Sequence, residues 1–250
     1  MAGGQERILR RRIKSVESTK KITKAMELIA ASRIVKAQGR VAAARPYSER
    51  ITDVIRNLAK GGAGLSHPLL TPNDDVHTVA YVVVTADRGL CGGYNTGVMR
   101  ATERAMRADE AAGRQAKLFV IGKKGLSYFR FRNAVIEASF LGVTDQPSYE
   151  QAREIAAAVS GAFDGGEVDE VELVYTQFLS AGSQRVVTRR LMPLDTSGLE
   201  DSEEAGGSSY EFEPGPGAIL ERLLPRYAEA RLFAALLDAS ASEHAARQRA

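Results

Sequence analysis

Glycine-rich segments give the first chemical signal in this sequence. Residues 85–95, Thr-Ala-Asp-Arg-Gly-Leu-Cys-Gly-Gly-Tyr-Asn, follow a run of β-branched residues and precede a helical pattern. A phosphate-binding loop lies at this position in an open parallel sheet. A dinucleotide loop also needs Gly-x-Gly-x-x-Gly, and Gly89, Gly92 and Gly93 do not have that spacing. The position therefore suits a nucleotide, but the residue pattern does not.

Other candidate centres are also incomplete. The pair Gly122-Lys123 follows a predicted strand, but its neighbours do not match a P-loop, and neither glycine segment carries residues to hold Mg²⁺. The three histidines, His67, His77 and His244, are far apart in the sequence. No Gly-x-Ser-x-Gly or His-Glu-x-x-His motif is present. We expect no catalytic residue, no metal and no cofactor in this chain.

Residues 85–95 make better sense as a contact surface. Glycines let the backbone turn tightly and approach a partner, and Arg88 offers a planar, bidentate donor to a carboxylate. An ordinary turn between a strand and a helix is the alternative. Cys91 is the single cysteine, so no internal disulfide can form, and we expect it to be a small buried apolar group.

A long helix must come before these elements. Between Gln5 and Gln38 there is no Gly or Pro, and apolar residues return every three or four positions. This spacing is typical of a coiled-coil seam. The seam comprises Leu9, Ile13, Val16, Ile22, Met26, Ile29, Ile34, Ala37, Val41 and Ala44. We expect residues 1–60 to form a rod that needs a protein partner, because a lone helix is marginal in water.

Charge is divided unevenly along the chain. Residues 1–50 hold thirteen Lys or Arg against four Glu, whereas acidic residues outnumber basic ones in the remainder, so the overall net charge of +3 hides a basic arm. Such an arm indicates an acidic partner, which could be nucleic acid, an anionic membrane surface or a carboxylate-rich protein. A solvated helix face is the plain alternative. No apolar run reaches the roughly 18 residues of a membrane helix.

Strand and helix patterns alternate after the rod. Residues 76–85 read as a strand buried on both faces, and 96–112 as a helix. Further strands are predicted at 117–121, 134–140, 168–178 and 184–194, and further helices at 122–132 and 149–163. The fold class is therefore α/β, with a Rossmann-like, mainly parallel domain over residues 76–194 and an antiparallel hairpin at its end.

The last part of the chain predicts a loop and a second long helix. Residues 195–217 are rich in Ser, Gly, Glu and Pro, so we expect a partly disordered loop. Residues 218–250 have helical periodicity, with Pro225 at a kink or near the first turn. No helix-stopping residue lies near Ala250, so we expect the sequence to stop within a helix.

Two long motifs carry a family resemblance. Residues 15–38, Ser-Val-Glu-Ser-Thr-Lys-Lys-Ile-Thr-Lys-Ala-Met-Glu-Leu-Ile-Ala-Ala-Ser-Arg-Ile-Val-Lys-Ala-Gln, closely resemble the N-terminal helix of the gamma subunit of F-type ATP synthases. Residues 85–95 resemble the second signature of that family, and residues 48–58 and 214–236 are also similar to it. The resemblance covers nearly the whole chain, except that the family's C-terminal helix continues much further.

The resemblance implies a rotary central stalk that couples proton flow to ATP synthesis or hydrolysis and helps to regulate the ATPase. Its partners would be the alpha and beta subunits, the epsilon subunit and the c-ring, on the cytoplasmic face of a bacterial membrane. The chain itself would not be catalytic. The expected subunit contacts are Lys20, Lys21, Lys24, Met26, Arg33, Lys36, Asp87, Arg88, Gly89, Leu90, Cys91, Gly92, Gly93 and Asn95.

Two other classes of protein remain open at this stage. A nucleic-acid-binding protein would place the basic helix in the major groove, but the acidic remainder and the apolar stripe argue against it. A nucleotide-binding α/β enzyme would use residues 85–95. Neither class accounts for both long motifs.

Overall fold

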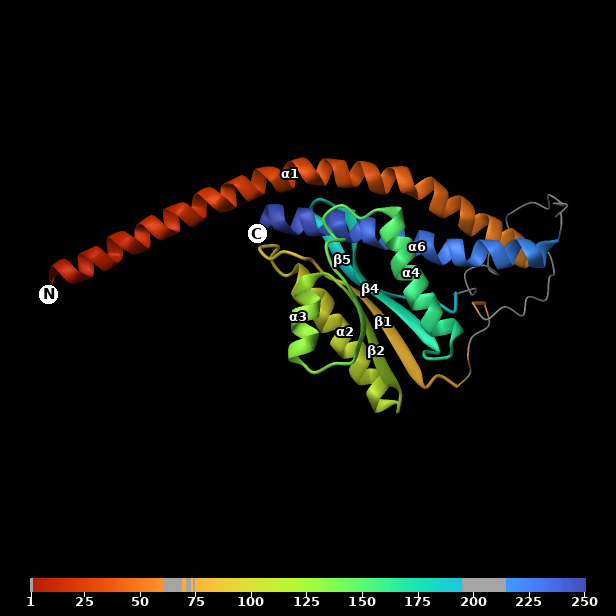
Figure 1. Ribbon diagram of the computed structural model, residues 1–250. Helices are drawn as coiled ribbons and strands as arrows, with labels where there is room; N and C mark the ends of the chain where they lie inside the picture. The colour runs from red at the N-terminus through yellow and green to blue at the C-terminus, as the bar shows by residue number, and fades with distance from the viewer. Residues whose placement is uncertain (1, 61–68, 71–72, 74, 195–214) are drawn as a thin grey trace.

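The computed structural model describes residues 2–60, 69–70, 73, 75–194 and 215–250 (Figure 1). The chain begins with a long helix, α1 (Ala2–Lys60), and ends with another, α6 (Pro216–Arg249). An α/β domain lies between them in the sequence. The domain contains, in chain order, β1 (Thr78–Val84), α2 (Tyr94–Ala111), β2 (Gln115–Ile121), α3 (Lys123–Phe131), β3 (Ile136–Phe140), α4 (Tyr149–Asp164), β4 (Glu170–Ser180) and β5 (Ser183–Met192).

The sheet has the topology that the alternating pattern predicts. Its strand order is β3-β2-β1-β4-β5, and β1 pairs in parallel with both β2 and β4. Strands β4 and β5 form the expected antiparallel hairpin. The α/β prediction, with a mainly parallel sheet between two long helices, is therefore confirmed.

Helices cover both faces of the sheet. Because successive residues of a strand point to opposite faces, Ala80 and Val82 of β1 join one apolar core while Val79 and Tyr81 join another. The first core also contains α4, α6 and the end of α1, and the second contains α2 and α3. The end of α1 is thus anchored by apolar burial, including Ile55, which is 1% exposed.

The two long helices run side by side in opposite directions along the second half of α1 (Figure 1). The first half of α1 projects beyond α6 and the domain. Of the predicted seam, Ile34 and Ala37 are buried within this chain, whereas five other residues are exposed, namely Leu9, Ile13, Val16, Ile22 and Ile29. No described residue covers that face of α1. The expectation that the rod needs a protein partner stays a prediction.

Prolines occur inside both long helices. Pro46 lies within α1, which continues to Lys60, and Pro225 lies within α6 rather than in its first turn. Pro216 takes the first-turn position of α6 instead. The loop expected at residues 195–217 lies almost entirely outside the described residues.

Gly122 permits a close approach between the backbones that follow β1 and β2. It separates β2 from α3 with φ of 94°, and a Cβ there would lie 2.1 Å from the carbonyl oxygen of Thr85. The Thr85 hydroxyl reinforces this approach, because it donates to the Ile121 carbonyl at 2.9 Å and accepts the Gly125 N–H at 2.9 Å. The ends of β1 and β2 and the start of α3 are therefore held together.

We expect Gly122→Ala to lower the free energy of unfolding by about 3 kcal/mol or more, through positive φ and the clash with Thr85. Gly142→Ala is the matched control, because Gly142 also has positive φ, at 75°, but no atom lies near its added Cβ. Its loss should be about 1–2 kcal/mol. Urea unfolding of the full-length variants measures both, and equal losses would contradict the proposed clash.

Candidate functional site

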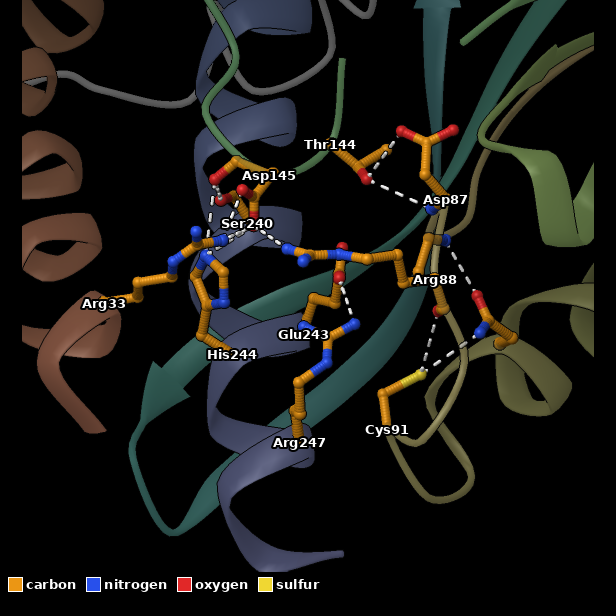
Figure 2. A network of polar contacts seen from close by, with 12 residues as sticks. Arg33, Asp87, Arg88, Cys91, Thr144, Asp145, Ser240, Glu243, His244 and Arg247 are labelled. Carbon is orange, nitrogen blue, oxygen red and sulfur yellow. Dashed lines mark hydrogen bonds and ion pairs between the residues drawn. The ribbon is translucent and has the colours of Figure 1, made fainter. Parts of the chain in front are cut away.

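Segments distant in sequence meet at the carboxyl edge of the parallel strands (Figure 2). The loop after β1, the start of α3 and the loop after β3 lie there, as expected for parallel strands whose carboxyl ends share one edge. Arg33 of α1 and the last turns of α6 reach the same place. We call this meeting point the junction, and its central residues are Asp87 and Asp145.

Asp87 ties three segments together through its carboxylate. It accepts the backbone N–H of Lys123 at 3.1 Å, the N–H of Gly142 at 3.0 Å and the hydroxyl of Thr144 at 3.2 Å. The bond to Lys123 lies at the N-terminus of α3, where backbone N–H groups and the helix dipole favour an anion. A side chain of the chain itself therefore occupies the position where a phosphate-binding segment at Gly122-Lys123 would hold its ligand.

Asp145 links the long helix to the domain. Its carboxylate pairs with Arg33 of α1 and, at 2.7 Å, with Arg88 of the loop after β1. Its backbone carbonyl accepts the hydroxyl of Ser240 at 3.0 Å, and Nε2 of His244 lies 3.3 Å from the same oxygen. One residue thus contacts α1, α6 and the loop at 85–93.

The charges of the junction shift the pKa values of its members. Burial alone would raise the pKa of Asp145, but the hydrogen bond from Arg33 and the positive charge of Arg88 bring it below its usual value. Burial lowers the pKa of His244, although the hydrogen bond to Asp145 and the negative charge of Asp145 oppose the fall. His244 is therefore neutral at physiological pH, and the junction depends on carboxylate and guanidinium charges.

A buried ion pair lies beside these residues on α6. Arg247 donates to Glu243 at 2.6 Å, and the two side chains are 6% and 2% exposed. Burial raises the pKa of Glu243, whereas Arg247 opposes the rise. A pair so deeply buried must remain paired, because an isolated buried charge is costly. Both partners lie on α6, one turn apart, so the pair is internal to that helix.

The loop at 85–93 packs on α6 through small and aromatic groups. Ala86, Cys91 and Tyr94 form a small core with Ala246. Asn95 fixes the loop from inside, because it accepts the Ala86 N–H at 2.8 Å and its amide lies 3.1 Å from the sulfur of Cys91. Cys91 is buried, so the expectation of a small buried group is confirmed, and burial also raises the pKa of its thiol.

The predicted contact residues fall into two groups. Lys20, Lys21, Lys24 and Lys36 are exposed on α1, and Met26 is half-buried. Arg33, Asp87, Arg88, Cys91 and Asn95 belong to the junction or its supporting loop.

The structure also brings some of the predicted residues together. Leu90, which is 64% exposed with φ of 58°, lines a groove of about 310 Å³ with Lys20, Lys24 and Met26. Gly89 is partly exposed beside it, and Gly92 and Gly93 are exposed. Lys21 and Lys36 do not line this groove.

Arg88 does bind a carboxylate, but that carboxylate belongs to Asp145 of the same chain. Sequence reasoning did not find Asp145, Thr144, Ser240 or the Glu243–Arg247 pair. For Thr144 and Asp145, the sequence did hold one signal, because they follow β3 at the edge of the sheet where ligands and polar groups gather. For their partners on α6, no local sequence pattern indicates a role in the junction.

Comparison with known proteins now gives a consistent result. A family profile described as ATP synthase matches residues 5–250. The chain is 48% identical to the ATP synthase gamma chain of Frankia casuarinae, over 99% of this chain and 84% of that one. It is 45% identical to the gamma chain of Mycolicibacterium smegmatis, over 98% and 84% of the two chains.

The chain belongs to the ATP synthase gamma family. It is a subunit of a membrane-associated complex, and the resemblance carried by residues 15–38 and 85–95 is confirmed. Within the described residues, no helix combines the length and the apolarity that a membrane crossing requires.

Solved structures share the fold of this gamma-family chain. A chain from the central stalk and c-ring of the Tetrahymena thermophila mitochondrial ATP synthase matches with a TM-score of 0.68 at 24% identity, over 91% of this chain and 96% of that one. A rotor chain from the Euglena gracilis mitochondrial enzyme matches with a TM-score of 0.51 at 17% identity, over 88% and 89%.

We expect Asp145→Asn to lower the free energy of unfolding at pH 7 by about 1 kcal/mol, because two partly exposed ion pairs are weakened. The depressed pKa of Asp145 stabilises the fold above its unfolded-state pKa, and this contribution disappears as the pH falls through the folded-state value. The difference between the variant and the wild type should therefore shrink between pH 5 and about pH 3. Denaturant unfolding across this range measures it.

Asp164→Asn is the matched control, because Asp164 is exposed at the end of α4. Its effect should be within about 0.5 kcal/mol at every pH. A loss for Asp145→Asn that did not depend on pH would contradict the charge-based account of the junction.

Proposed function

We propose that this chain is the rotor of the ATP synthase central stalk. In this arrangement the two long helices form an axle within the ring of alpha and beta subunits, and the α/β domain stands on the c-ring beside the epsilon subunit. The observation that carries the proposal is the uncovered half of α1, where Ile8, Ile13, Val16 and Ile22 are 58–65% exposed. Large apolar side chains on a projecting helix need a protein surface.

The proposed contact surface combines this helix with the tip of the loop at 85–93. Exposed lysines at 20, 21, 24 and 36 offer positive charge to acidic loops of the beta subunits. Met26 and Leu90 add apolar contact beside Lys20 and Lys24, and Gly89, Gly92 and Gly93 allow close backbone approach. Arg33, Asp87, Arg88, Cys91 and Asn95 would act from within, by holding the loop against the helices.

Nucleotide chemistry in this proposal belongs to the alpha and beta subunits, and this chain is non-catalytic. The Asp87 carboxylate at the start of α3 supports this division, since it fills the anion position there. We assign residues 1–60 and 218–250 to the axle and residues 76–194 to the α/β domain. The complex would place the chain peripherally, on the cytoplasmic face of a bacterial membrane.

The proposed mechanism is mechanical. Proton flow turns the c-ring and the α/β domain on it, and the junction transmits that rotation to the axle. An asymmetric axle presents a different surface to each beta subunit in turn, so each nucleotide site passes through different affinities. Regulation by epsilon would act through the same domain.

Reconstitution tests the proposal directly. The full-length protein is mixed with alpha and beta subunits, and complex formation, ATP hydrolysis and rotation of a probe attached to the α/β domain are measured. We expect an active complex in which ATP hydrolysis turns the probe. Failure to join the ring, or hydrolysis with a stationary probe, would contradict the proposal.

We expect single Lys→Ala changes at 20, 21 or 24 to leave coupled rotation within about fivefold of wild type, because an exposed ion pair contributes about 0–1 kcal/mol. The triple variant should lose about tenfold or more. Arg100, Arg104 and Arg153, exposed on the α/β domain, give a charge-matched triple Ala control that should remain coupled. A single lysine change that abolished rotation in an intact complex would show that the contact is not distributed.

A further inference from the structure

A second polar site lies away from the junction, between the long helices and the sheet. A pocket of about 260 Å³ opens where α1 and α6 meet strands β4 and β5. Its apolar walls include Val41, Leu173 and Leu191, and the aromatic ring of Tyr175 also lines it. Four arginines from three elements line the same space, namely Arg45 of α1, Arg189 and Arg190 of β5 and Arg231 of α6. We call this space the arginine pocket.

The four arginines are not equally engaged. Arg190 pairs with Glu170 at 2.7 Å, and Arg231 lies over the ring of Tyr227 with its guanidinium carbon 5.5 Å from the ring centre. Within the described part of the chain, Arg45 and Arg189 have no hydrogen bond and no ion pair within 4.0 Å. Two guanidinium groups on the pocket therefore keep their hydrogen-bonding capacity.

Asp238 is the carboxylate that faces these two arginines. It lines the pocket from α6 and is half-buried, and both Arg189 and Arg45 act on it electrostatically. Burial raises its pKa to about 6, even though the two arginines oppose the rise. One carboxylate that loses its charge in mildly acidic solution does not balance two arginines. Glu49, the other carboxylate on the pocket, is exposed to water.

We propose that the arginine pocket binds a small, doubly charged oxyanion of the phosphate or sulfate type between Arg45 and Arg189. A guanidinium presents a planar fork of N–H donors that matches such an anion in a bidentate way. The volume is below the roughly 300–1,000 Å³ of sites for larger ligands, so it suits one phosphate group rather than a nucleotide. The phosphate could be free or could project from a larger molecule.

Binding would join two elements of the fold. Arg45 belongs to the long helix α1 and Arg189 to the edge strand β5, so one anion between them links the helix to the sheet. A ligand that binds only the folded state stabilises it by mass action. This inference does not depend on the proposed rotor function, because it concerns a ligand of this chain alone.

Isothermal titration of the full-length protein with sodium sulfate tests the proposal, with ionic strength held constant by sodium chloride. We expect saturable binding and a matching rise in melting temperature. Arg45→Gln and Arg189→Gln should each weaken binding by about tenfold or more, since each removes a charge-assisted contact. The control Arg104→Gln/Arg153→Gln removes the same charge as the double variant Arg45→Gln/Arg189→Gln, but from exposed positions on α2 and α4, and should bind as wild type.

Asp238→Asn provides a gain-of-binding test that a misfolded variant could not imitate. Removing the competing carboxylate should tighten sulfate binding several-fold at pH 7.5. Sulfate keeps its charge between pH 5.5 and 7.5, so wild-type affinity should rise as the pH falls and Asp238 takes up a proton. Asp238→Asn should abolish that dependence.

Titration of other groups around Asp238 would not produce a pH dependence that Asp238→Asn abolishes. Arg45 and Glu49 line the pocket with it from α1, Tyr175 from β4, Arg189 from β5 and Arg231 from α6, whereas the side chain of Arg190 pairs with Glu170 on the other face of the sheet. The pKa of Glu172 is also raised, to about 7. Glu172 is paired with Arg190 rather than Arg189, so it points to the opposite face of the sheet and is unchanged in Asp238→Asn.

Titration with inorganic phosphate and with adenosine monophosphate identifies the source of the anion. Binding of phosphate alone would indicate a free ion, and equal binding of both would indicate a projecting phosphate group. Absence of saturable sulfate binding up to 50 mM would overturn the proposal. Binding that survived in Arg45→Gln/Arg189→Gln, or that Asp238→Asn did not tighten, would also overturn it.

Discussion

Charge pairing at Asp145 is the constraint on which the arrangement of rod and domain depends. Apolar contacts between a helix and a sheet are not directional, so they tolerate sliding and rotation. The Asp145 carboxylate pairs with Arg33 and with Arg88. This pairing does not tolerate sliding, because a shift of α1 by one helical turn would separate Arg33 from Asp145. The pairing therefore fixes where along α1 the domain sits and which way it faces.

Apolar contacts and ion pairs hold α1 against the domain at different points along the helix pair. At the far end of α1, Ile51, Ile55 and Leu58 join the core that also holds α4 and α6, which supplies adhesion. At the junction, the ion pair between Arg33 and Asp145 fixes the orientation of α1 relative to the domain. Two anchors separated along a rigid helix resist twisting in a way that one anchor cannot.

The fold was predictable because its signals are local. The unbroken apolar run around Val82 indicates a strand buried on both faces, and the glycine-free basic stretch indicates one long helix. The junction was not predictable in the same way. Asp145 and Arg33 are separated by 112 residues, and each side chain alone resembles a solvated surface charge. Arg88 could be recognised as a carboxylate ligand, but only the packed structure reveals that the carboxylate is internal.

The curvature of α1 has a geometric consequence for the whole molecule. Figure 1 shows α1 as an arc along its length rather than a straight cylinder. Pro46 weakens the helix locally, because it lacks the N–H that would bond to the carbonyl of Ala42. A straight cylinder that spins about its own axis displaces nothing around it. When a curved helix that is held at one end rotates about its axis, its free end moves around a circle. The curvature of α1 alone would therefore convert rotation into a lateral displacement of its free end.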